Sequence, residues 1–383
     1  MNGLRALVRL GAEAPGGLAL PDAQPTPSQL YAPRGVYFDE RVFVAVDSGN
    51  HRVLIWHGRP TTDGQPADVV LGQPNPFTEG PRAGGRGPEN GFHLPTGALV
   101  IDERLLVADA WHHRILVWAT IPTESDTPPD FVLGQDDFAL TEPNRGGAVS
   151  ACSLYWPYGL GWIDGWFYVA DTGNRRVLGW EGVPEPNRAA DLVLGQVDAE
   201  HNGENRDGPV AADSFRWPHD IAGTAENLLI ADAGNHRVLG WLPAPTRDRA
   251  ADVVLGQPGF DTAREFPYGA QSAAGFRFPY GVSSDGDLLA VADTANNRVL
   301  LWHGLPTTVA QAADCVLGQP DFASNGENRW SAVTDDSLCW PYGLWLTGDT
   351  LAIADSGNNR ILLWDVSAFT RSEVRQIEQP VHP

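Results

Sequence analysis

Short apolar runs separated by turn-forming residues follow one another along the whole chain. Residues 156–196 show the arrangement: the runs WPYGLGWI, WFYVAD, RRVLGW and ADLVLGQ are separated by an Asp-Gly pair, by TGN and by a polar, proline-containing link. Runs this short, bounded by Gly, Pro, Asn and Asp, are typical of β-strands and not of helices. The segment therefore predicts a unit of four antiparallel strands.

This unit recurs six times. The lines VAVDSGNHRVLIW, VADAWHHRILVW, VADTGNRRVLGW, IADAGNHRVLGW, VADTANNRVLLW and IADSGNNRILLW place their aspartates 61 or 62 residues apart. These aspartates are Asp47, Asp109, Asp171, Asp232, Asp293 and Asp355. A regular period over the whole chain marks a repeat architecture, and six four-stranded units predict an all-β, six-bladed β-propeller. Its blades start near residues 31, 93, 155, 216, 277 and 339, and residues 1–383 form a single domain in this interpretation.

Residues that recur in every unit are expected to build the scaffold. The glycines Gly49, Gly173, Gly234 and Gly357 are predicted to supply a positive φ at the turn between the second and third strands. The recurring Asp before this turn and the recurring Arg after it are expected to bond turn amides and each other. The tryptophans that end the third strands should fill the space between blades; they are Trp56, Trp118, Trp180, Trp241, Trp302 and Trp364.

The fourth strand with its LGQ ending occurs five times, and the last unit lacks it. The N-terminal segment ALVRLGAE supplies a substitute at nearly the same distance from the next turn proline. We therefore expect residues 4–10 to complete the sixth blade beside Arg360–Trp364, which removes an exposed sheet edge.

Composition and charge limit the kinds of partner that the protein is expected to bind. The formal charge is −22, and all 26 basic residues are Arg. Acidic surfaces repel phosphate backbones, so no nucleic-acid partner is expected. No window is apolar enough to span a membrane and no secretory signal is evident, which predicts a cytoplasmic protein with no membrane partner. A propeller ring is complete in itself, so the chain is expected to be a monomer.

The lines VADTGNRRVLGW, IADAGNHRVLGW and IADSGNNRILLW resemble the NHL repeat, and VLGQP followed by DF is similar to a bacterial variant of it. The resemblance covers essentially the whole chain and implies a β-propeller. It does not imply one function, because related propellers include sensors, RNA-binding domains, lyases and interaction platforms.

Differences between the copies indicate where function lies. The long loops that lead into each first strand lie on the same face as the recurring turns, so binding residues are expected there. The residue after each turn proline should line the mouth of the central channel. These predicted binding residues are Arg34, Thr96, Tyr158, His219, Tyr280 and Tyr342.

Two blades depart from the pattern. In blade four, His219 is followed by Asp220 where other blades have glycine, and the pair is a candidate acid–base couple or, with His93, a candidate metal site. In blade two, Trp111 and His112 replace the glycine–asparagine turn and are candidate partner contacts, as is Trp330 in a long loop.

Three functions remain open from the sequence. The first is a non-catalytic interaction scaffold that binds a protein through the long-loop face, for instance as an assembly or regulatory accessory of a larger complex such as a redox enzyme. The second is an enzyme similar to propeller lyases and lactonases, with its site at His219 and Asp220. The third is a sensor of a small ligand or glycan. No cofactor is expected.

Overall fold

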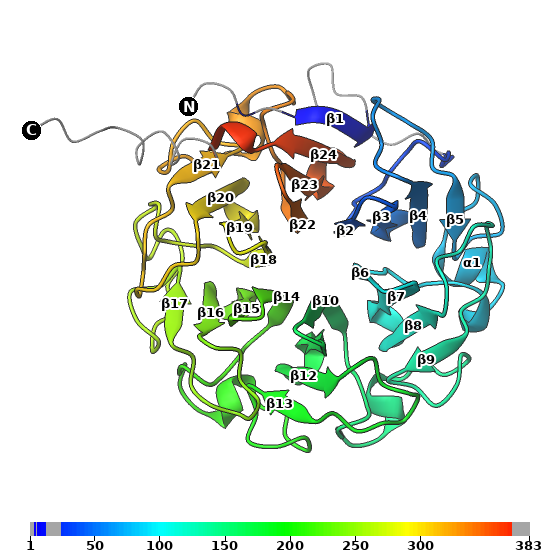
Figure 1. The fold of residues 1–383 in the computed structure, drawn as a ribbon, viewed down its shortest axis with the longest axis horizontal. Coiled ribbons are helices and arrows are strands. Elements are labelled where there is room, and N and C mark those ends of the chain that lie inside the picture. The colour runs from blue at the N-terminus through cyan, green and yellow to red at the C-terminus, as the bar shows by residue number, and fades with distance from the viewer. Residues whose placement is uncertain (1–3, 5, 13–23, 370–383) are drawn as a thin grey trace, which may run out of the picture.

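The computed structural model describes residues 4, 6–12 and 24–369, which form a closed ring of six four-stranded antiparallel sheets (Figure 1). In each sheet the strands follow one another outward from the central channel. The predicted six-bladed β-propeller is therefore confirmed.

The bounds of the strands repeat closely from blade to blade. Blade one contains β2 (Gly35–Phe38), β3 (Val42–Asp47), β4 (Arg52–His57) and β5 (Val69–Leu71). Blade two contains β6 (Gly97–Ile101), β7 (Arg104–Asp109), β8 (Arg114–Trp118) and β9 (Phe131–Leu133). Blade three contains β10 (Pro157–Ile163), β11 (Trp166–Asp171), β12 (Arg176–Glu181) and β13 (Leu192–Leu194). Blade four contains β14 (Pro218–Thr224), β15 (Asn227–Asp232), β16 (Arg237–Trp241) and β17 (Val253–Leu255). Blade five contains β18 (Pro279–Ser284), β19 (Leu288–Asp293), β20 (Arg298–His303) and β21 (Cys315–Leu317). Blade six contains β22 (Pro341–Thr347), β23 (Thr350–Asp355), β24 (Arg360–Asp365) and β1 (Ala6–Gly11).

Helical segments are short. The long loops hold α1 (Pro81–Gly85), η2 (Pro88–Asn90), η4 (Pro143–Gly146), η6 (Glu204–Asp207) and η9 (Glu327–Trp330). The turns between second and third strands are 3₁₀ turns: η1 (Ser48–Asn50), η3 (Ala110–His112), η5 (Thr172–Asn174), η7 (Ala233–Asn235), η8 (Thr294–Asn296) and η10 (Ser356–Asn358). None of the helices in the described part of the chain has the length and apolarity that a membrane crossing requires.

The N-terminal strand closes the ring, as the missing fourth strand of the last repeat predicts. β1 pairs antiparallel with β24, and its register places Leu10 opposite Ile361 and Gly11 opposite Arg360. Leu10 is buried, at 1% exposure. Of the predicted segment 4–10, residue 5 lies outside the described residues and the strand begins at Ala6.

The recurring Asp and Arg form a buried ion pair in every blade. In blade one, Asp47 Oδ2 accepts hydrogen bonds from Arg52 Nε at 2.7 Å and from Asn50 Nδ2 at 2.8 Å. The other carboxylate oxygen accepts from the backbone N–H of Tyr31, in the long loop, at 2.7 Å. The guanidinium also donates to loop carbonyls, including that of Gln29. The predicted bond between Asp and Arg is confirmed; the carboxylate also binds the Asn50 side-chain amide of the turn, and the remaining bonds anchor the long loop.

The predicted role of the recurring glycines is wrong. The positive φ belongs to the residue after each 3₁₀ turn, for example 54° at His51, and not to the glycines, which are absent from the described residues with positive φ. In the blades that have glycine at this position the preceding loop approaches closely, whereas blades two and five have Trp111 and Ala295 there. A Cβ at Gly49 would lie 2.6 Å from the carbonyl oxygen of Tyr31, and one at Gly173 would lie 2.5 Å from the ring of Tyr155.

Tryptophans fill the space between blades, as predicted. All six third-strand tryptophans are buried, with exposures of at most 5%. Five of them donate an indole N–H to a carbonyl of the link that follows, as Trp56 does to Gln65 at 3.1 Å. Each of these hydrogen bonds ties the third strand to the link before the fourth strand of the same blade, which orients the indole ring within the core.

Candidate functional site

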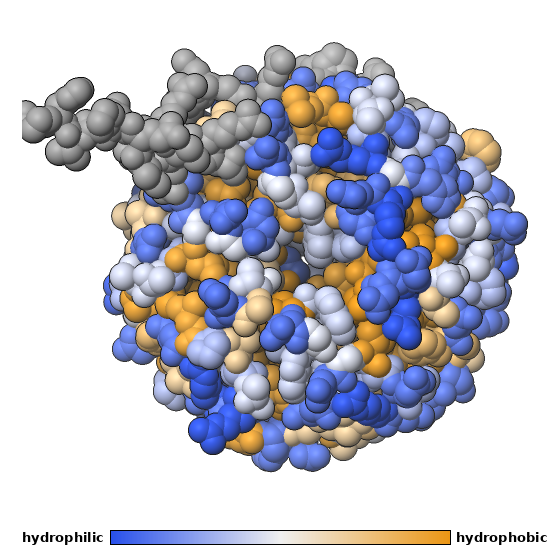
Figure 2. Space-filling model, in the orientation of Figure 1, coloured by the Kyte–Doolittle hydropathy of each residue, from blue (hydrophilic) through white to orange (hydrophobic). Residues whose placement is uncertain are grey.

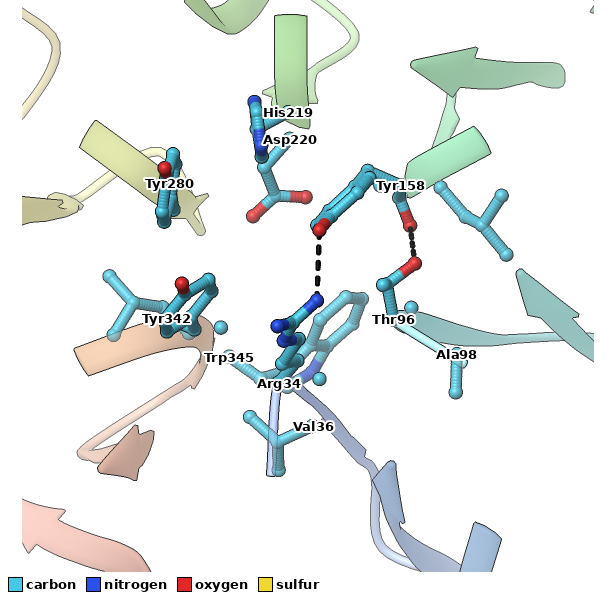
Figure 3. Close-up of a pocket in the computed structure, with 16 residues that line it drawn as sticks. Arg34, Val36, Thr96, Ala98, Tyr158, His219, Asp220, Tyr280, Tyr342 and Trp345 are labelled. Atoms are coloured by element: carbon cyan, nitrogen blue, oxygen red, sulfur yellow. Dashed lines mark hydrogen bonds between the residues drawn. The ribbon is translucent and has the colours of Figure 1, made fainter. Parts of the chain in front are cut away.

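The six residues that follow the turn prolines surround a small cavity at the channel mouth. Because each lies directly before, or second in, an innermost strand, the ring symmetry brings their side chains together (Figure 3). The cavity has a volume of about 50 Å³. The lining residues at this level are Arg34, Thr96, Tyr158, His219, Tyr280 and Tyr342.

Aromatic rings form one continuous wall of the mouth. The ring of His219 stacks on Tyr280, with centroids 4.3 Å apart, and lies 4.5 Å from the ring of Tyr158. Tyr280 in turn lies 4.8 Å from Tyr342. His219 Nδ1 lies 3.0 Å from the carbonyl oxygen of Trp217. Burial lowers the pKa of His219 to about 4, so its imidazole is neutral at pH 7 and acts as part of the wall.

Arg34 reaches across the mouth from blade one. Its Nη1 donates to the hydroxyl of Tyr158 in blade three at 2.9 Å, and its guanidinium carbon lies 5.2 Å from the ring centroid of Tyr342 (Figure 3). This cation–π contact and the hydrogen bond hold a positive charge over the channel.

Asp220 places a carboxylate in the channel where five blades have glycine. Its Oδ2 accepts from the backbone N–H of Val282 in blade five, and its Oδ1 from that of Ile221, both at 3.0 Å. Burial is the main influence and raises the pKa of Asp220 to about 7. Within the described residues no hydrogen bond joins Asp220 to His219, so the structure does not bring the two together as an acid–base couple.

A larger cavity adjoins the mouth further along the channel. Its volume is about 230 Å³, and Asp220, Leu160, Leu344 and Trp345 line both cavities. Two serines, Ser283 and Ser284, and several apolar side chains complete the larger cavity. In the space-filling view, the opening at the centre of the ring is narrow (Figure 2).

His93 lies apart from the channel cavity. Its ring is 5.4 Å from that of His51, 5.5 Å from that of His112 and 5.6 Å from that of Trp111. Across the part of the chain that the structure describes, no three His, Cys, Asp or Glu side chains are placed to bind a metal ion. The candidate metal set of His93, His219 and Asp220 is therefore not assembled.

The two candidate contacts of blade two differ from each other. Trp111 is 41% exposed, and its ring lies 5.2 Å from that of Trp156. His112 is fully buried, with Nδ1 2.8 Å from Asp109, in the place that asparagine takes in other blades. The prediction that His112 contacts a partner is wrong, because its side chain substitutes for a scaffold amide. Trp330 is 80% exposed on its long loop.

The residue directly before each turn proline was not singled out by the sequence analysis, and it is aromatic in four blades. With the neighbouring Trp111, these side chains form a group beside the mouth that we term the aromatic crown. Its members are Trp111, Trp156, Trp217, Phe278 and Trp340. Trp340 is 39% exposed, and the others before a proline are half-buried. Aligning the six repeats on their turn prolines would identify these aromatic residues from the sequence.

A hydrogen bond between blades holds the backbone of the crown. The N–H of Trp156 donates to Nδ1 of His113 in the previous blade at 3.2 Å, and the N–H of Trp340 donates to Oδ1 of Asn297 at 2.9 Å. The same bond occurs at Ala32, Leu94 and Phe278. Together with Trp156 and Trp340, these five residues have a positive φ between 46° and 54°. Blade three has Arg175 at the acceptor position, and there Trp217 bonds to Asp232 instead.

By sequence, the chain is similar to proteins that carry NHL repeats. It is 24% identical over 378 residues to NHL repeat-containing protein 2 of Bos taurus, covering 90% of this chain and 48% of that protein. For the Homo sapiens protein of the same name, the identity is 23% over 375 residues. The match covers 89% of this chain and 47% of the human protein. The chain thus spans about half the length of the curated relatives it matches. No protein-family model matches it.

Solved propellers are similar at low identity. A chain of the nidogen/laminin complex gives a TM-score of 0.48 at 16% identity, covering 92% of this chain and 99% of that one. Virginiamycin B lyase from Staphylococcus aureus gives a TM-score of 0.45 at 10% identity. The match covers 89% of this chain and 97% of the lyase chain. Similarity at this level gives no indication of function.

Proposed function

We propose that this six-bladed β-propeller, which is similar in sequence to NHL-repeat proteins, is a non-catalytic interaction platform that docks a protein on its long-loop face. The observation that carries the proposal is the aromatic crown beside the channel mouth. Trp is one of the residue types enriched at the energetic centres of protein interfaces, where a few residues supply most of the binding energy.

The scaffold does not require aromatic side chains at the crown positions. Ala32 adopts the same left-handed backbone as Trp156 and Trp340, with φ of 46°, and makes the same hydrogen bond to the previous blade. The fold is therefore satisfied by a methyl group at this position. The large rings at the other blades need a different explanation, and contact with a partner provides one.

The crown is held in place before any partner arrives. Bulky residues with positive φ are uncommon and persist only where the surrounding structure fixes them. The inter-blade hydrogen bond fixes the backbone of Trp156, Phe278 and Trp340, and ring contacts such as Trp217 on Phe278, 6.2 Å apart, order the side chains. Pre-ordered side chains lose less conformational entropy on binding, which strengthens an interface.

Charge indicates what kind of partner surface fits. The chain carries 48 acidic and 26 basic residues. Acidic groups lie next to the crown: Trp340 Nε1 donates to Glu327 at 3.0 Å, and Glu204 pairs with Arg216 at 3.2 Å. A partner segment with apolar side chains and a basic rim complements this surface, and like charge would reject acidic partners.

The test is an affinity capture from the native cell with tagged wild-type protein and three variants. Trp156→Ala with Trp340→Ala removes two crown rings, Trp330→Ala removes the exposed loop ring, and Val309→Ala is the control on an opposite-face link. We expect one partner to be lost from the crown variant and kept by the control. Retention of every captured protein by the crown variant would refute docking on this face.

A further inference from the structure

Arg34 and Asp220 line the channel mouth without pairing with each other. Within the described residues, Arg34 donates one side-chain hydrogen bond, to a tyrosine hydroxyl, although a guanidinium has five N–H donors. The carboxylate of Asp220 accepts from two backbone N–H groups and forms no ion pair with any described residue. Both side chains nevertheless line the same cavity (Figure 3).

Buried charges elsewhere in this protein are paired closely. The six scaffold Asp–Arg pairs have N–O distances of 2.7 to 2.9 Å and no exposure. Arg34 and Asp220 are only half-buried, but both turn unused hydrogen-bonding capacity toward one cavity, which indicates groups that a ligand completes.

We propose that the channel binds a small zwitterion that carries an ammonium and a carboxylate group, such as a free amino acid. Asp220 accepts hydrogen bonds from the ammonium, and Arg34 donates to the carboxylate. The stacked rings of His219, Tyr280 and Tyr342 form the wall between the two charges. The remainder of the ligand extends into the adjoining cavity of about 230 Å³, between Leu344 and Trp345.

A ligand of a single charge fits this arrangement less well. A plain anion on Arg34 meets the Asp220 carboxylate across the same cavity, and a plain amine on Asp220 meets the guanidinium. Each encounter sets like charges against each other in a site of low dielectric constant, where such repulsion is strong. A zwitterion pairs both charges at once. This site is independent of the proposed protein docking, since it uses the channel interior and not the crown.

The first experiment needs only wild-type protein. The proteinogenic amino acids are screened by thermal shift, and the strongest binder is titrated calorimetrically beside its decarboxylated amine and its deaminated acid. We expect the amino acid to raise the melting temperature and each analogue to bind at least about tenfold more weakly. The absence of any shift across the panel would overturn the proposal, as would an analogue that binds as tightly as the amino acid.

Variants then assign the two roles. Asp220→Asn is expected to weaken binding of the amino acid at least about tenfold and to leave the affinity for the deaminated acid nearly unchanged. Arg34→Gln is expected to weaken binding of the amino acid similarly and to leave the affinity for the decarboxylated amine nearly unchanged. Glu40→Gln, an exposed charge removed on the opposite face, is the control, and melting curves verify folding. Equal weakening of all three ligands in both variants would contradict the assignment.

Discussion

Replacing His51, His113 and His236 with asparagine should remove much of the protein's sensitivity to acid. In each case imidazole Nδ1 accepts the N–H of a residue in the next blade, at 3.0 to 3.2 Å. A nitrogen that accepts a hydrogen bond cannot carry a proton, so protonation breaks the bond between blades. Blades five and six use asparagine for the same bond, which shows that asparagine fits.

The pKa values give the direction and the size of the effect. Burial lowers the pKa of His51 and of His113 from 6.5 to about 4, and burial also lowers that of His236, with Glu265 opposing it. The unfolded chain therefore takes up protons first, and stability that is complete above pH 6.5 is lost as the pH falls toward 4. At pH 5 the loss is about 2 kcal/mol for His113, which is 8% exposed, and smaller for the more exposed His51.

The assay is urea denaturation followed by tryptophan fluorescence at pH 7.5 and pH 5. The wild type and the triple asparagine variant should have similar midpoints at pH 7.5, and the variant should be about 3 kcal/mol more stable than the wild type at pH 5. His57→Asn, on an exposed histidine outside these bonds, controls for the loss of an imidazole. Parallel loss of stability by the wild type and the triple variant between the two pH values would refute the reasoning.

Three further predictions concern the scaffold, each checked by thermal or urea denaturation. Deletion of residues 1–12 removes β1 and should lower the melting temperature by on the order of 10 °C, and an unchanged curve would contradict closure by this strand. Gly173→Ala should cost about 1–3 kcal/mol because its Cβ would lie 2.5 Å from a neighbouring ring, whereas Gly147→Ala, with 3.7 Å of clearance, should be nearly neutral; equal costs would exclude the close-approach explanation. Arg176→Met leaves a buried carboxylate unpaired and should cost about 3–5 kcal/mol, against less than about 1 kcal/mol for Arg86→Met at an exposed pair; a small loss for both would show that the buried pair is dispensable.

The architecture could be predicted because it depends on properties that a sequence displays directly. Strand periodicity, turn residues and a constant repeat length together determine six similar blades, and counting the fourth strands locates the closing strand. The innermost residues follow from the same register, because the residue after each turn proline has the same place in every blade; Tyr158, His219 and Tyr280 are therefore predictable as neighbours.

Contacts across the turn and between blades could not be predicted in this way. Glycine next to asparagine indicates a turn but does not show which residue has the positive φ. The pattern therefore predicts a positive φ at Gly49, whereas the structure has it at His51. The bond from Leu94 to His51 joins residues 43 positions apart, and its acceptor is histidine in some blades and asparagine in others. What these blades share is a side chain that can accept a hydrogen bond, and not one residue type. A search for identical residues overlooks such a property.

The pairing of β1 with β24 has a consequence for synthesis of the chain. Ala6 finds its partner only when Trp364 has left the ribosome, and at about 5–20 residues per second this takes roughly 20–70 s. During that interval the first strand emerges with its backbone amides and Leu10 uncovered, while five blades form behind it. Until β24 is available, Arg9 is the charged residue within this uncovered strand, and a charge on an unpaired strand edge disfavours pairing with a wrong partner.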